Sequence, residues 1–152
     1  MPYLKYYREE SKNFPNHNRI VVENSNVQNL VNQITEYFKL SHLDVLFDLN
    51  IIGNVEGQYR NNKTIKGKFI MGKRCSEISF RNKKLISLLT IIHEVGHHWD
   101  YEKNGPFRTL DKSVEKHLYG YRIKWRKAHT KKHKYAMKKI LEAYDRGDLY
   151  FY

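Results

Sequence analysis

Apolar residues in the first third of the chain recur at intervals of three and four, which predicts a helix beginning at Ser25. Its buried face would consist of Val27, Leu30, Val31, Ile34, Tyr37 and Phe38. This spacing places side chains on one side of an α-helix. Residues 1–24 show no clear period and contain Pro2 and Pro15, so we expect an extended lead-in followed by a single domain over residues 25–152.

The middle of the chain changes to a period of two, which predicts short strands. Apolar residues occupy every second position from Val45 to Ile51. We expect further strands over residues 55–59, 64–70 and 76–80, because Asn-rich and Gly-containing stretches separate them. This succession predicts a small antiparallel sheet, arranged as a meander.

The helical period then returns twice. The first run predicts a buried helix that ends near Asn104-Gly105-Pro106, and its apolar positions are Leu85, Leu88, Leu89, Ile92, Val95 and Trp99. The second run predicts a last helix from about Asp111 to Tyr144. The predicted fold class is therefore α+β, with an N-terminal helix, a small antiparallel sheet, a buried helix and a long C-terminal basic helix.

Composition indicates the cellular compartment in which the protein would function. Cys75 is the single cysteine, so neither an internal disulfide nor a thiolate-rich zinc cluster can form, and a reducing compartment is favoured. No run of about 18 apolar residues and no signal-peptide pattern is present. These observations predict a cytoplasmic protein that does not enter a membrane.

Charge is strongly positive and unevenly distributed. Lys and Arg number 28 against 16 Asp and Glu, which gives a net charge of +12. Residues 122–139 contain nine Lys or Arg and no acidic residue. A cationic helix of this kind would contact the phosphates of DNA or RNA. The alternative is a solvated face that keeps the protein soluble.

The buried helix carries the pattern with the most specific chemistry, His93-Glu94-Val95-Gly96-His97. Histidines four apart on a helix project from one face and can share one ion. Zn²⁺ held by these imidazoles and a third ligand would keep a position for water, whose proton Glu94 would accept as general base. The alternatives are ordinary core histidines, or a structural zinc in a non-enzymatic module that binds nucleic acid or protein.

The segment Ile91-Ile92-His93-Glu94-Val95-Gly96-His97-His98-Trp99-Asp100-Tyr101 resembles the active-site helix of the zincin superfamily of metallopeptidases, especially members with an HExGH pattern. The order of helix, sheet, helix and helix is similar to a minimal zincin domain over residues 25–130. The resemblance implies Zn²⁺, hydrolysis of a peptide bond in a protein or peptide substrate, His93 and His97 as ligands, and Glu94 as the base.

The third ligand stays open between three residues. In the gluzincin branch it is a Glu about twenty residues downstream on the next helix, and Glu115 matches that place. Asp111 lies one turn earlier on nearly the same face and could replace it or orient a ligand. SprT-like proteases instead use a downstream His followed by Gly, a pattern that His117 and Gly120 approximate.

Four other residues near the motif receive lesser roles. His98 is expected at the edge of the site, and Asp100 at the helix end or beside an imidazole that it orients. His129 and His133 form a second pair four residues apart. Neighbouring lysines would repel a cation there, so we expect this second pair on a solvated helix face.

Overall fold

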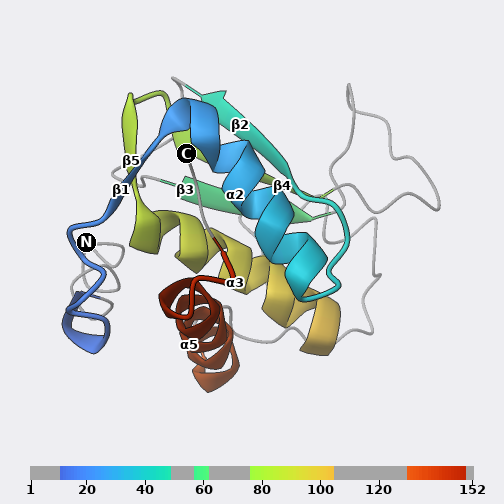
Figure 1. The fold of residues 1–152 in the computed structure, drawn as a ribbon. Helices are drawn as coiled ribbons and strands as arrows, with labels where there is room; N and C mark the ends of the chain where they lie inside the picture. The colour runs from blue at the N-terminus through green and yellow to red at the C-terminus, as the bar shows by residue number, and fades with distance from the viewer. Residues whose placement is uncertain (1–10, 49–56, 62–75, 105–129, 150–152) are drawn as a thin grey trace, which may run out of the picture.

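The computed structural model describes residues 11–48, 57–61, 76–104 and 130–149 (Figure 1). The described chain combines helices with short strands, and the α+β class expected from the sequence is confirmed. The elements in order are β1 (Val21–Glu23), α2 (Asn24–Tyr37), β2 (Asp44–Asp48), β3 (Gly57–Asn61), β4 (Ser76–Arg81), β5 (Leu85–Ser87), α3 (Leu88–Asn104) and α5 (Lys131–Asp145).

Helix α2 forms where the first apolar period predicted it. Its stripe packs into the core, with Val27, Val31 and Ile34 fully buried. The helix ends because Lys39 adopts a left-handed conformation (φ 55°), and the amide of Leu40 turns back to the carbonyl of Thr35 at 2.8 Å. A left-handed residue just past the last turn is a common way to satisfy the final carbonyls of a helix.

The three-stranded sheet has the order β2-β4-β3, so β4 lies in its centre. β3 runs antiparallel to β4, whereas β2 runs parallel to it. The expected antiparallel meander is therefore wrong for β2 and β4. The central position of β4 is explained by its burial. Ile78 and Phe80 are fully buried on one face of this strand, and Glu77 and Ser79 are buried on the other. A strand covered on both faces takes the central position.

Strand β1 pairs antiparallel with β5, in a register that joins Val22 to Ile86. Val22 is fully buried, so the end of the segment expected as a separate lead-in belongs to the core of the domain. Because residues 85–87 form strand β5, the next helix begins later than the sequence predicted. Leu85, expected as its first apolar position, is 48% exposed in this strand, and α3 begins at Leu88.

Helix α3 packs against α2, α5 and both sheets, and it lies near the middle of the molecule (Figure 1). Helix α5 begins at Lys131 because Thr130 is extended (φ −126°, ψ 178°). The last helix is thus not continuous across residue 130, and the part expected over residues 111–129 lies outside the described residues. None of the helices in the described ranges is long and apolar enough to cross a membrane.

Candidate metal centre

The centre is built on α3, whose residues from Leu88 to His98 are all buried. Apolar side chains dominate this stretch, so the helix is held on most sides by the core. Two histidines four residues apart project from the same side of such a helix. The helix therefore fixes the directions of His93 and His97 before any ion binds.

His93 and His97 approach each other through their Nε2 atoms, which are 3.1 Å apart. Their rings are nearly perpendicular, at 87°. Two nitrogens bound to one tetrahedral zinc at 2.0–2.1 Å would be separated by about 3.3 Å. The two imidazoles are thus already spaced as ligands of a single ion.

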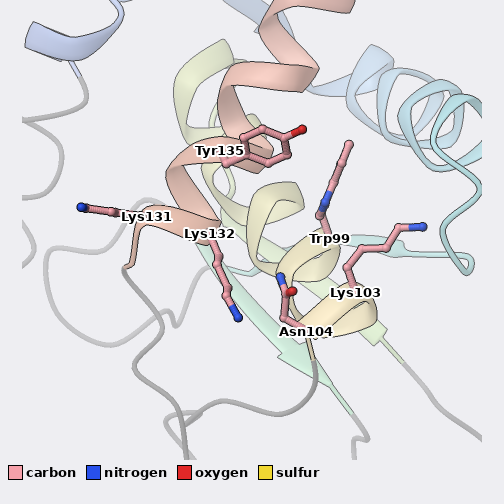
Figure 2. A pocket seen from close by; sticks show the side chains of 6 residues that line it. All are labelled: Trp99, Lys103, Asn104, Lys131, Lys132 and Tyr135. Carbon is pink, nitrogen blue, oxygen red and sulfur yellow. The ribbon is translucent and has the colours of Figure 1, made fainter.

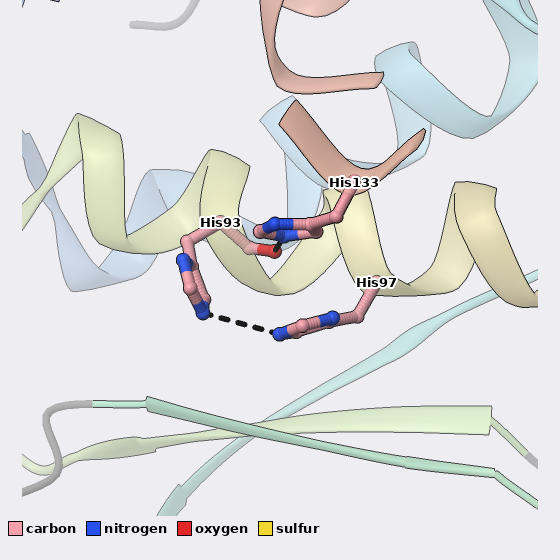
Figure 3. A group of neighbouring side chains, drawn as sticks. All are labelled: His93, His97 and His133. Carbon is pink, nitrogen blue, oxygen red and sulfur yellow. Dashed lines mark hydrogen bonds between the residues drawn. The ribbon is translucent and has the colours of Figure 1, made fainter. Parts of the chain in front are cut away.

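A third histidine, His133 of α5, completes the group (Figure 3). Its ring stacks on that of His97, with centroids 4.0 Å apart and planes inclined by 17°. One ring nitrogen from each of the three histidines lies within 4.8 Å of the others. The side chains are only 4–6% exposed, so the group is shielded from bulk water.

The orientation of His133 is set by the backbone of α3. Its Nε2 lies 2.8 Å from the carbonyl oxygen of His93. Because a carbonyl only accepts, Nε2 donates this hydrogen bond, and Nδ1 of the neutral ring keeps the lone pair that could bind a metal. Histidine ligands commonly donate their second N–H to a carbonyl in this way, which fixes the ring and its tautomer.

Burial also determines the charge of His93. Desolvation lowers the pKa of His93 from 6.5 to about 4, so this imidazole is neutral near pH 7. The carboxylate of Glu94 is buried beside it, with Oε1 3.9 Å from His93 Nε2. Neutral imidazoles suit zinc as well as other transition metals, and the nearby carboxylate could accept a proton.

Gly96 permits the close packing of the two helices at this point. A Cβ added there would lie 3.1 Å from Nε2 of His133 and 3.2 Å from Cγ of Met137. These separations are too short for ordinary contact. The glycine of the motif therefore allows α5 to bring His133 up to His93 and His97.

His133 corrects one expectation from the sequence, since a solvated position was predicted for it. Lys131, Lys132 and Lys134 are exposed, but His133 is 4% exposed. Successive residues of a helix point about 100° apart, so lysines adjacent in sequence need not face the same surroundings. Two signals were available beforehand: the spacing of His133 from His129, and Gly96, whose missing side chain permits a close approach.

The remaining expected site residues fall into two groups. Glu115, Asp111 and His117, the three candidates for the third ligand, lie outside the described residues, as does His129. His98 is not part of the group of three histidines and instead contacts the loop after α2.

Nε2 of His98 lies 2.9 Å from the carbonyl oxygen of Ser41 and 3.5 Å from Oε1 of Glu102. Asp100 is fully buried and accepts a hydrogen bond of 2.9 Å from Asn104, one turn farther along α3. This bond fits the helix-end role expected for Asp100.

Comparisons with known proteins give no family for this chain. No family model matches it, and no curated protein or solved structure is similar to it. Its function must be inferred from the centre itself.

Proposed function

We propose that this protein is a zinc-dependent metalloprotease that hydrolyses a peptide bond, with Glu94 as the general base. The supporting observation is the buried group of His93, His97 and His133 with the Glu94 carboxylate beside it. Three protein ligands and an open fourth position are typical of catalytic zinc sites. The similarity of the motif to the zincin helix supplies the class of reaction.

Each residue of the centre has a distinct task in this proposal. Zinc, when bound, would acidify a water molecule and polarise the peptide carbonyl. Glu94 would accept the proton of that water and then deliver it to the leaving amine. His93 and His97 would hold the ion from α3, and His133 would hold it from α5, oriented by the hydrogen bond to the His93 carbonyl.

A second candidate is a non-enzymatic module with a structural zinc. It is favoured by the burial of the three rings, because structural sites are closed to solvent. The proximity of Glu94 favours catalysis instead, since a structural ion needs no carboxylate beside its ligands. The two candidates differ in what Glu94 does, and this difference can be measured.

The proposed substrate is a protein or peptide in the cytoplasm, with DNA or RNA as a further partner through residues 122–139. Within the described part of this region, α5 exposes Lys131, Lys132, Lys134 and Lys138. A cationic helix face attracts polyanions from a distance. The partner would bring the enzyme to substrates near nucleic acid.

The first test measures metal content and identifies the third ligand. Elemental analysis of protein purified without chelator should find about one zinc per chain. His133→Ala should lose it, whereas Glu115→Ala should retain it. His42→Ala is the matched control, because His42 is exposed and pairs with Asp44 at 2.7 Å. Zinc that survives in His133→Ala and disappears in Glu115→Ala would transfer the third ligand to Glu115.

The second test separates the enzyme from the structural module. Glu94→Gln should keep its zinc and lose peptide hydrolysis by about a hundredfold to ten-thousandfold, the usual contribution of a general base. The substrate would be a mixed peptide library, read by mass spectrometry. Absence of cleavage by zinc-loaded wild type, or equal cleavage by Glu94→Gln, would favour the structural module.

A further inference from the structure

A cavity of about 440 Å³ opens where the end of α3 meets the beginning of α5 (Figure 2). Its size falls within the range of ligand pockets, about 300–1,000 Å³. Each helix contributes three of the lining residues, which are Trp99, Lys103 and Asn104 from α3 and Lys131, Lys132 and Tyr135 from α5. None of these residues belongs to the metal centre.

The lining is positively charged. Among the residues that the structure describes, the lining contains three lysines and no carboxylate. The nearby carboxylate of Asp100 is fully buried and accepts a hydrogen bond from Asn104. The ammonium groups of Lys103, Lys131 and Lys132 point in different directions around the opening (Figure 2). Such a spread suits a ligand with several separate negative charges better than a single anion.

The uncharged part of the lining consists of the Asn104 amide and two aromatic rings. Trp99 is half-buried, and its ring packs against Phe38 with centroids 4.4 Å apart. This contact holds the indole in place. Tyr135 is 55% exposed, and the ammonium of Lys139 lies 5.4 Å from the centre of its ring. Both rings thus present planar surface beside positive charge.

We propose that this pocket binds single-stranded nucleic acid, which names the site and the form of the nucleic-acid partner and rests on that part of the proposed function. Bases would stack on Trp99 and Tyr135, and successive phosphates would pair with the surrounding lysines. Aromatic platforms within a positive groove are the usual means of binding single strands without sequence preference.

Other polyanions would contact fewer of the features that line the pocket. A duplex keeps the faces of its bases stacked inside, so the two rings would find no partner. An acidic peptide would pair with the lysines but would leave the aromatic surface unused. Single strands alone offer separated charges and free planar faces together.

The test is a fluorescence titration of the purified full chain carrying Trp125→Phe, which leaves Trp99 as the single tryptophan. The probe is oligothymidylate of about a dozen nucleotides, close to the site sizes of single-strand binders. We expect quenching of Trp99 that saturates at low salt. Duplex DNA of equal length and a poly-glutamate peptide should bind more weakly.

Two variants locate the binding. Tyr135→Ala, at an exposed position, should weaken binding by about fivefold to a hundredfold, the effect of losing one stacked base. Lys132→Gln should lower the dependence of log K on log salt by about 0.7, as expected for one lost phosphate contact. Lys84→Gln removes the same charge at an exposed turn between β4 and β5, away from the pocket, and should change neither quantity.

Several outcomes would overturn the proposal. These are no quenching at low salt, equal effects of Lys132→Gln and Lys84→Gln, an unchanged affinity in Tyr135→Ala, or tighter binding of the duplex or the peptide. The titration requires no hydrolysis. A negative titration would therefore not count against the proposed metal centre. Conversely, a protein that cleaves no peptide could still bind the single strand.

Discussion

At Gly96, the intrinsic preference of a helix for alanine over glycine conflicts with the close packing of α5 on α3. Replacing a glycine inside a helix by alanine ordinarily stabilises a protein by about 0.5–1 kcal/mol. Here the new Cβ would press on His133 and Met137 at 3.1–3.2 Å. We expect Gly96→Ala to weaken zinc binding by about tenfold or more, since displaced partners of ligands have effects of this size.

Zinc affinity of Gly96→Ala would be measured by competition with a chromophoric chelator. Lys138→Ala, an exposed position on α5, serves as the control and should bind as wild type. A Gly96→Ala protein that is more stable and binds zinc normally would contradict the close approach of α5.

His93 predicts how the metal-free protein responds to acid. Its pKa in the folded state, about 4, lies below the ordinary value of 6.5, so the unfolded chain binds more protons between these values. The free energy of unfolding should therefore fall as the pH drops from 6.5 to 4, by up to about 3 kcal/mol. Above pH 6.5 this contribution is fully present. Urea unfolding in EDTA at several pH values measures this change in the free energy of unfolding. If the free energy of unfolding of His93→Gln depended on pH as in wild type, protonation of His93 would be ruled out as the cause.

At the scale of elements, local periodicity in the sequence was sufficient to place α2 and most of α3, but it did not reveal the break before α5 at Thr130. The apolar stripes of α2 and α3 are visible as spacings of three and four. Tyr37 of the first stripe is nevertheless 45% exposed, and α3 is buried all round from Leu88 to His98 rather than along one stripe. Partners of strands depend on residues distant in sequence. The parallel pairing of β2 with β4 could not be inferred, because short strands joined by turns look the same whichever neighbour they choose.

The candidate site was likewise predictable only where it is local. His93, Glu94 and His97 share one helix, so their grouping follows from spacing alone. His133 joins them through the packing of α5 on α3, which no local pattern records. The lysines beside His133 in the sequence suggested that His133 is also exposed to solvent. In the helix, however, these lysines face solvent and His133 faces the core.

For the whole molecule, zinc bound as proposed should act as a stabiliser, because it would join α3 to α5. A ligand that binds the folded state at a hundred times its dissociation constant adds about 2.7 kcal/mol. For a chain of this length, that should raise Tm by roughly 5–10 °C. Calorimetry with EDTA and with excess zinc measures the shift. His133→Ala should show little of it, and a full shift in that variant would mean that zinc binds without α5.

The distance of His133 along the chain has a consequence for biosynthesis. It follows His93 by 40 residues, so the ribosome makes the first two of the proposed ligands before the third. At about 5–20 residues per second, the delay is roughly 2–8 seconds. During this time the nascent chain carries Glu94 and two histidines but no complete centre. The proposed protease would therefore acquire its activity only once α5 has been synthesised and has docked.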